Sequence, residues 1–166
     1  PCHGTGAQGG RGYPNLNDDA WLWGGTLEDI HTTLKYGIRS THEETRYSEM
    51  LAFLRDGILS RDEVDAVVEY VLALSGQEAD AALAERGRAV FESNCTACHM
   101  EDGTGDRTQG APNLTDQIWL YGGDRDTIWQ SVANGRRGVM PAWQDRLDPL
   151  TIKSLAVYVH ALGGGE

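Results

Sequence analysis

The sequence lacks three features that would each indicate a common class of protein. It has no run of 18 apolar residues, which excludes a transmembrane helix within these residues. It has no excess of basic residues: 25 Asp and Glu stand against 14 Lys and Arg, a formal net charge of −11, so it is not expected to bind nucleic acid. It shows no sustained period-two alternation of apolar and polar residues, so we expect almost no β-sheet. These absences leave an acidic, largely helical protein whose partners are basic or neutral.

Cysteine is also scarce, and its placement is informative. The three cysteines are Cys2, Cys95 and Cys98. The segment Cys95-Thr96-Ala97-Cys98-His99 matches the c-type haem attachment pattern. Two thiols three positions apart can each form a thioether with a haem vinyl group, while the adjacent histidine reaches the iron. A zinc site would need more Cys and His ligands nearby. A redox dithiol normally lies at the start of a helix, whereas this Cys-x-x-Cys motif lies at the end of one.

The chain repeats itself. Pro14-Asn15-Leu16 and Trp21-Leu22-Trp23-Gly24-Gly25 recur 98 positions later as Pro112-Asn113-Leu114 and Trp119-Leu120-Tyr121-Gly122-Gly123. We therefore predict two copies of one small domain, residues 1–76 and 77–166. Because Cys2-His3 precedes the first set of landmarks as Cys98-His99 precedes the second, Pro1-Cys2-His3 is expected to end a first haem site whose leading cysteine lies upstream.

Five amphipathic helices are predicted from apolar stripes and capping residues. Ser60 and Glu63 form a capping box for a helix over 61–74, and Asp148 with Pro149 begins its counterpart, which Gly163 ends. The other three helices are expected over 26–36, 80–94 and 124–134. The expected fold class is therefore all-α.

A low-spin electron carrier needs a sixth iron ligand, and methionine raises the reduction potential. Met140, in a loop bounded by Gly138 and Pro141, is predicted to ligate the second haem, and Met50, in the matching place of the first copy, the first haem. His42 remains the alternative ligand for the first haem. Met100 follows His99 directly and cannot reach the opposite haem face.

Further residues are candidates for the surroundings of the haems. The Pro14 and Pro112 carbonyls are expected to accept a hydrogen bond from the second ring nitrogen of each ligating histidine. Five aromatic residues are candidates for lining the haems and binding their propionates, with simple core packing as the alternative: Trp21, Trp23, Trp119, Tyr121 and Trp143.

These residues resemble class I cytochrome c domains, in which an N-terminal helix carrying a glycine and an aromatic crosses the C-terminal helix. Gly87 and Phe91 match that pattern, and the resemblance places them against Tyr158. The tandem arrangement and the ending Val139-Met140-Pro141-Ala142-Trp143 are similar to the dihaem CcoP (FixP) subunit family of cbb3-type cytochrome c oxidase. The sequence departs from that family at its start. It also departs at Leu51, which follows Met50 in the first copy where a proline, Pro141, follows Met140 in the second copy.

The resemblance implies two covalently bound haem c groups and an electron-relay subunit that breaks no substrate bond itself. It implies a cytochrome c donor, soluble or anchored, and the monohaem and catalytic oxidase subunits as partners. It also places both domains on the periplasmic face of the inner membrane, with an anchor upstream of Pro1. Two alternatives stay open: a free periplasmic dihaem carrier of the cytochrome c4 type, and a dihaem peroxidase, which would need an open iron position.

Overall fold

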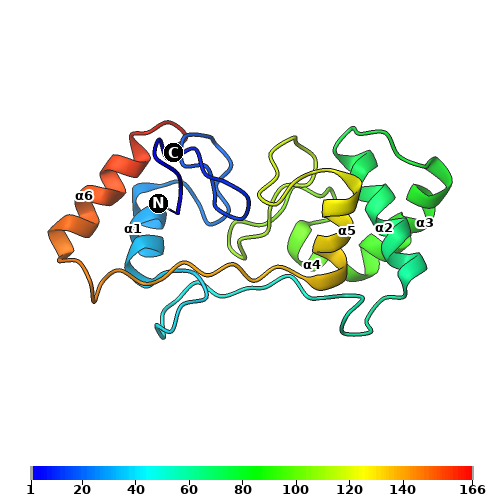
Figure 1. Cartoon of the computed structure of the whole chain (residues 1–166), viewed down its shortest axis with the longest axis horizontal. Helices are drawn as coiled ribbons and strands as arrows, with labels where there is room; N and C mark the ends of the chain where they lie inside the picture. The colour runs from blue at the N-terminus through cyan, green and yellow to red at the C-terminus, as the bar shows by residue number, and fades with distance from the viewer. Residues whose placement is uncertain (1, 166) are drawn as a thin grey trace. The chain divides into compact units, whose positions relative to one another are not determined.

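The computed structural model describes residues 2–165, and its regular structure is helical (Figure 1). The helices are α1 (Leu27–Tyr36), α2 (Arg61–Leu74), α3 (Ala81–Asn94), α4 (Thr96–His99), α5 (Arg125–Asn134) and α6 (Pro149–His160). Within the described residues the only β pairing consists of isolated bridges. The expectation of helices with little strand is therefore confirmed. None of the described helices is long and apolar enough to cross a membrane.

Capping side chains fix where the helices begin. The side chains of Thr26, Asp80, Asp124 and Asp148 each accept a hydrogen bond from the first turn of the helix that follows. Ser60 and Glu63 form the predicted capping box of α2. The predicted helices are confirmed within a residue or so, except that α6 ends at His160, before Gly163.

The compact units of the structure differ from the sequence halves 1–76 and 77–166. One unit, here called the His3 unit, comprises residues 1–48, 107–110 and 137–166; the other, the His99 unit, comprises 49–106 and 111–136. Each unit thus combines the Cys-His motif of one half of the repeat with the last helix of the other half. Helix α2 of the first half lies in the His99 unit, and α6 of the second half lies in the His3 unit.

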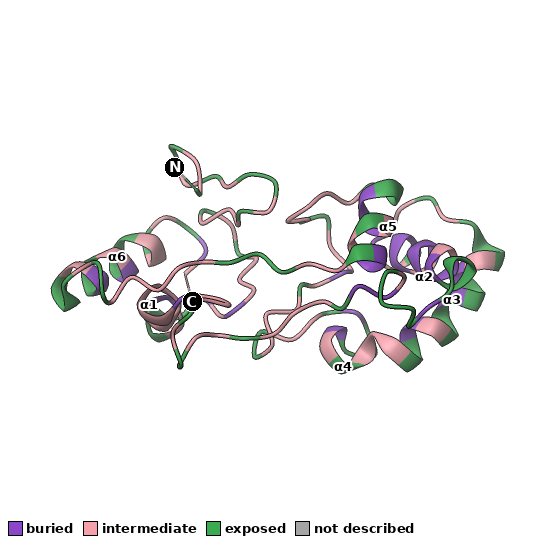
Figure 2. Cartoon of the chain, turned by 60° about the horizontal axis from the view of Figure 1, so that its bottom comes forward, coloured by how far each residue is buried: buried purple, intermediate pink, exposed green. Residues whose placement is uncertain are grey.

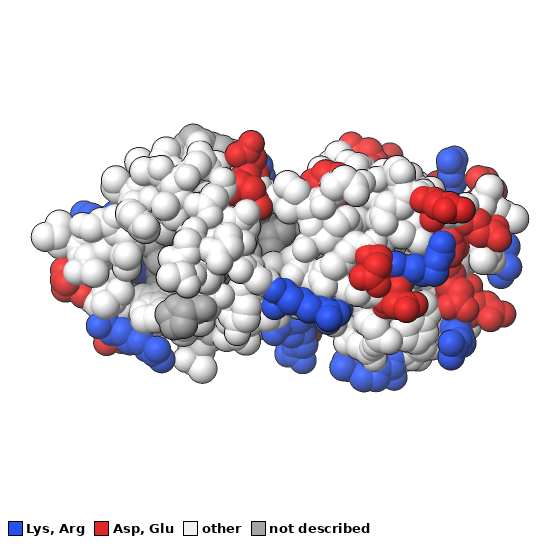
Figure 3. Space-filling model, turned by 45° about the horizontal axis from the view of Figure 1, so that its top comes forward, with Lys and Arg blue, Asp and Glu red and all other residues white. Residues whose placement is uncertain are grey.

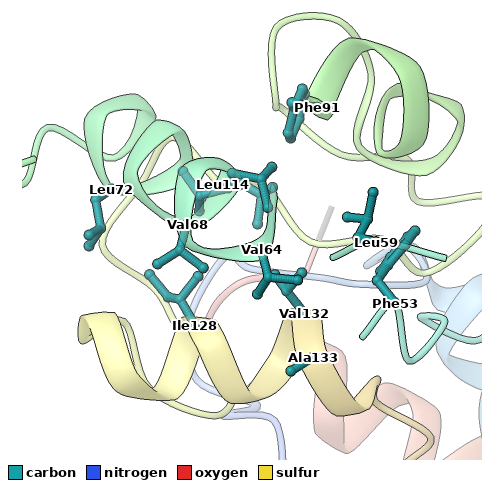
Figure 4. Close-up of a cluster of buried hydrophobic side chains, with 12 residues drawn as sticks. Phe53, Leu59, Val64, Val68, Leu72, Phe91, Leu114, Ile128, Val132 and Ala133 are labelled. Carbon is teal, nitrogen blue, oxygen red and sulfur yellow. The ribbon is translucent and has the colours of Figure 1, made fainter. Parts of the chain in front are cut away.

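The core of the His99 unit forms where α2 packs against α3 and α5. Apolar side chains of the three helices point toward one another (Figure 4), and the α2 residues Val64, Val67 and Val68 are at most 1 % exposed. Seven of the twelve core residues precede residue 77: Phe53, Leu59, Val64, Val67, Val68, Val71 and Leu72. The core of this unit therefore depends on residues from both halves.

The expected contact of Gly87 and Phe91 with Tyr158 is wrong. The Phe91 ring lies 5.2 Å from the ring of Tyr70 in α2, and a Cβ added at Gly87 would lie 2.0 Å from the Ala66 carbonyl oxygen. Tyr158 belongs to the other unit and is 62 % exposed. The glycine and the aromatic do serve a helix crossing, but their partner is the last helix of the first half.

Replacing Gly87 with valine should destabilise the His99 unit by about 3 kcal/mol. The new side chain would meet backbone of α2, which cannot rotate away as a flexible side chain can. Ala89→Val, on the exposed side of the same helix, is the control and should cost only the small helix-propensity difference. Denaturant unfolding monitored by circular dichroism compares the two variants, and equal losses would contradict this packing.

The His3 unit is built around the packing of α1 against α6. Ile30 of α1 and Ile152 and Ala156 of α6 are buried, at 3–4 % exposed. The C-terminal segment closes the unit, since the Trp21 indole nitrogen donates a hydrogen bond to the Gly164 carbonyl. Many of its other residues are of intermediate exposure (Figure 2).

In each unit, the turn that follows a helix forms backbone hydrogen bonds with a segment from the other half of the repeat. In the His3 unit, Ile38 and Met140 exchange backbone hydrogen bonds of 2.9 and 3.0 Å. In the His99 unit, Arg136 and Met50 exchange bonds of 3.2 and 3.3 Å. Gly37 and Gly135, which end α1 and α5 with φ of 73° and 71°, permit these approaches: a Cβ at either would lie 2.4 Å from the carbonyl oxygen of Met140 or Met50.

Candidate functional site

The Cys95–His99 segment is positioned by the end of α3 and the short helix α4. The Cys95 amide closes α3 on the Phe91 carbonyl, and α4 then turns the chain so that His99 is 9 % exposed. The His99 Nδ1 atom lies 3.0 Å from the Pro112 carbonyl oxygen, which confirms the predicted partner. This hydrogen bond fixes the ring and leaves Nε2 as the nitrogen that can bind iron.

Burial sets the protonation of this site. It lowers the pKa of His99, an effect that the Pro112 hydrogen bond partly opposes, so the imidazole is neutral near pH 7 as a metal ligand must be. Burial, and less strongly the neighbouring Cys98, raises the pKa of Cys95 to about 12, so this sulfur is a thiol near pH 7. Residues 2–165 contain no cluster of three or more His, Cys, Asp or Glu that could hold a metal ion.

The Cys2-His3 segment repeats this geometry. The His3 Nδ1 atom lies 2.8 Å from the Pro14 carbonyl oxygen, again as predicted. A glycine six positions after each histidine donates its amide to that histidine's carbonyl: Gly9 to His3 at 2.8 Å and Gly105 to His99 at 3.0 Å. Pro1 lies outside the described residues. The two loops therefore present their histidines in the same way.

The structure places the candidate methionines in the opposite units from those expected. Met50 belongs to the His99 unit, where it packs against the same apolar core as Cys95. Met140 belongs to the His3 unit. Each unit thus contains a Cys-His motif of one half and a candidate methionine of the other half. Met100, the residue directly after His99, is 47 % exposed.

His42, the alternative ligand for the first haem, does lie in the His3 unit, but both of its ring nitrogens contact protein atoms. Nδ1 accepts the Glu44 amide at 3.0 Å, and Nε2 contacts the Gln144 side-chain amide. The ring also lies 4.8 Å from the Tyr36 ring. Both ring nitrogens of His42 are therefore engaged with protein atoms.

Buried donor atoms in the His99 unit suit an anionic cofactor. The Trp119 Nε1 and Arg136 Nη2 atoms are buried and have no hydrogen-bond partner among the described residues. The Arg136 guanidinium lies 4.1 Å from the centre of the Tyr121 ring. Buried, unpaired donors of this kind suit carboxylate groups, so Trp119 and Arg136 are candidates to hold the propionates of a haem. Sequence reasoning named Trp119 and Tyr121 but missed Arg136.

The His3 unit has a similar arginine. Arg46 lies over the Trp23 ring at 5.6 Å, pairs with Asp29 at 3.0 Å and has a buried Nε without a partner among the described residues. Arg46 and Arg136 each stand four positions before a candidate methionine, Met50 and Met140. That spacing was the sequence signal that could have identified both arginines.

Comparison with known proteins gives one family-model match for each half of the sequence. A family model described as cytochrome c matches residues 1–75, and one described as cytochrome c oxidase, cbb3-type, subunit III matches residues 82–159. A cbb3-type oxidase subunit CcoP from Cereibacter sphaeroides is 60 % identical over 166 residues, and a FixP subunit from a Bradyrhizobium species is 57 % identical over 169. In both cases the match covers 99 % of this chain and 57 % of the relative, so the chain spans a little over half the length of these relatives. The chain belongs to the family of cbb3-type cytochrome c oxidase subunits named CcoP and FixP.

Proposed function

We propose that this chain carries two covalently bound haem c groups and relays single electrons between them. The observation that carries the proposal is the pair of equivalent histidines, each fixed through Nδ1 by a proline carbonyl beside a Cys-His motif. Bound haem c supplies an iron that is reversibly oxidised and reduced by one electron. Each half is proposed to contribute one class I cytochrome c domain to the sequence, with the last helices exchanged between compact units.

The ligand sets we propose are His99 with Met50 and His3 with Met140. Support for the first set is that Met50 and Cys95 pack against one apolar core. Support for the second is the backbone pairing of Met140 with Ile38, which mirrors that of Met50 with Arg136. Cys95 and Cys98 would hold the second haem covalently, and Cys2 would supply one thioether to the first.

The protein's own residues would keep each iron six-coordinate and its surroundings rigid. The Pro112 and Pro14 carbonyls hold the histidine rings in one orientation, and the thioether ligand favours ferrous iron and a high potential. Arg136 would neutralise the charge of a propionate of the second haem, and the Trp119 indole would donate a hydrogen bond to a propionate. With both axial positions filled, the function is electron transfer, which disfavours the dihaem peroxidase alternative.

In the whole protein, we infer that these units pass electrons from a cytochrome c donor toward the oxygen-reducing subunit of a cbb3-type oxidase. The chain spans 57 % of relatives that carry this oxidase name. The location we propose is the periplasmic face of the inner membrane, with an anchor outside this chain. A free dihaem carrier of the c4 type would share the haem sites but would not co-purify with oxidase subunits.

The acidity of the chain is concentrated in the His99 unit. Its residues include 16 acidic and 6 basic side chains, a formal charge of −10, whereas the His3 unit has 9 and 8, a charge of −1. Figure 3 shows Asp and Glu side chains gathered over the part of the chain that contains α2 and α3. The sequence halves 1–76 and 77–166 have formal charges of −6 and −5, so this difference is not visible when the chain is divided into halves. A basic electron donor is therefore proposed to dock on the His99 unit.

Electron transfer from a basic cytochrome c should consequently slow as salt rises, because screening weakens long-range attraction between the partners. Stopped-flow reduction of the oxidised protein between 20 and 300 mM salt is expected to show a fall of about tenfold or more. Reversing charge on exposed α2 and α3 residues, as in Asp62→Lys with Glu85→Lys, should weaken the salt dependence. Glu43→Lys with Asp145→Lys, both exposed in the His3 unit, is the control, and equal effects of the two pairs would contradict docking on the His99 unit.

The proposed function is tested on the protein that includes the residues upstream of Pro1. Haem staining after denaturing electrophoresis and an iron count should give two covalent haems, and redox titration should give two reversible high-potential waves. One iron per chain, or hydrogen peroxide turnover comparable with that of a peroxidase, would contradict the proposal.

A further inference from the structure

Each unit holds one arginine over an aromatic ring, at equivalent places of the repeat. Arg46 lies over the Trp23 ring and Arg136 over the Tyr121 ring, and these rings stand 98 positions apart. Each arginine has one buried nitrogen without a hydrogen-bond partner among the described residues, Nε of Arg46 and Nη2 of Arg136. Both arginines therefore keep a donor for a further anion.

Only Arg46 already has a carboxylate partner. Its Nη2 atom lies 3.0 Å from Oδ1 of Asp29 in the first turn of α1. Burial acts to raise the pKa of Asp29, but hydrogen bonds from Thr26 and Arg46 and the Arg46 charge together lower it, so this group is ionised near pH 7. Arg136 instead donates through Nε to the Ser131 hydroxyl at 2.9 Å and forms no ion pair within residues 2–165.

The residue equivalent to Asp29 is Thr127, which carries no charge. Each is the third residue of its helix, α1 or α5. Each also lies against an equivalent glycine, since a Cβ added at Gly24 would meet the Asp29 carboxylate and one added at Gly122 would meet the Thr127 methyl group. The two positions thus share their local geometry and differ in charge.

The arginines are also directed at these positions in the same way. Arg46 Nη2 lies 3.3 Å from the Asp29 carbonyl oxygen. Arg136 reaches the Thr127 carbonyl oxygen through the Ser131 hydroxyl, which donates to it at 2.9 Å. A carboxylate at position 127 would consequently face Arg136, as Asp29 faces Arg46.

We propose that Asp29 lowers the reduction potential of the haem in the His3 unit by neutralising Arg46, whereas Thr127 leaves the charge of Arg136 available to the haem in the His99 unit. The proposal rests on the proposed haem sites. Ferrous haem carries one more negative charge than ferric haem, so an unneutralised arginine beside a propionate stabilises the ferrous form. With Asp29 present, the arginine, its partner and one propionate leave one negative charge uncompensated.

A second donor differs between the units in the same sense. The Trp21 indole nitrogen donates to the Gly164 carbonyl. The equivalent nitrogen of Trp119 is buried and has no partner among the described residues. The His3 unit therefore uses internally a donor that the His99 unit keeps for a propionate, which adds to the difference made by Asp29.

Exchanging the two side chains tests the proposal in the haem-loaded protein that includes the residues upstream of Pro1. Asp29→Thr should raise the equilibrium constant for reduction of the first haem about tenfold, a shift of about 59 mV for one electron. Asp29→Asn, which keeps the shape of the side chain, should shift it in the same direction. Thr127→Asp should lower the equilibrium constant of the second haem by a similar factor.

Two controls separate the charge at these positions from other effects. Glu28→Gln removes one charge from an exposed neighbour of Asp29 and should change the potential by less than about twofold in the equilibrium constant, because water and salt screen it. Thr127→Asn has the shape of Thr127→Asp without its charge and should leave the second wave in place.

Potentiometric titration reports both haems. Equal shifts from Asp29→Thr and Glu28→Gln, or from Thr127→Asp and Thr127→Asn, would overturn the proposal, as would waves that no exchange moves. Two reversible waves would remain in all of these outcomes, so the electron-transfer proposal would stand. Loss of a wave from the unaltered protein would instead contradict the haem sites themselves.

Discussion

Replacing Met50 with histidine should lower the reduction potential of the haem bound at Cys95, Cys98 and His99, although Met50 lies in the other half of the sequence. Imidazole lacks the preference of a thioether for ferrous iron, so a fall of roughly 0.1–0.3 V is expected within the about 0.8 V that axial ligands span. The reason for this assignment is that Met50 packs against the core of the His99 unit. Potentiometric titration followed by absorbance measures both waves.

Met140→His is the matched variant and should shift the other wave. The waves are assigned with a protein in which Cys95 and Cys98 are both alanine, because the wave lost there belongs to the second haem. Under our proposal Met50→His moves that same wave and Met140→His does not. If Met140→His shifts the potential of the second haem instead, Met140 is the ligand of that haem. In the haem-loaded protein, each haem would then take its histidine and its methionine from the same half.

Expressing the sequence halves separately should produce unstable proteins. A chain of residues 77–166 retains the second haem motif but loses seven of the twelve core residues of the His99 unit, including those of α2. Losing the large buried side chains of one helix removes several kcal/mol, which is comparable with the whole stability of a small domain. Circular dichroism and haem staining should show little folded, haem-loaded product from this half.

Residues 49–136, by contrast, should fold and bind one haem. This continuous segment contains the whole His99 unit, with α2, α3, α4 and α5, Met50 and the second haem motif. The fragment cuts across both sequence repeats, so its folding would be unexpected for two independent tandem domains. Comparable yields of folded protein from 77–166 and 49–136 would contradict the composition of the units.

The sequence predicted the local structure well because local signals determine it. Capping residues and glycines specify where helices begin and end, and the Cys-His motifs with their following prolines specify each loop within about 15 residues. Each prediction of this kind depended on residues close together in the chain.

The helix that α3 packs against, and the unit in which each methionine lies, could not be predicted, because the repeat makes the two choices chemically equivalent. Gly37 and Gly135 offer the same close approach, and Met50 and Met140 satisfy it equally, each with a carbonyl 2.4 Å from an added Cβ. Elements of nearly identical sequence can be exchanged at little energetic cost, as in domain swapping. The concentration of charge in one unit was hidden for the same reason.

The most direct test of the central claim is the ferric absorption spectrum of the 49–136 fragment. A methionine-ligated ferric haem has a sulfur-to-iron charge-transfer band near the red edge of the visible spectrum. The fragment lacks Met140, so our account predicts that the band is present, disappears in Met50→Leu and survives in Met100→Leu. Absence of the band from the folded, haem-loaded fragment, or its survival in Met50→Leu, would contradict the proposal that each haem takes its histidine from one half and its methionine from the other.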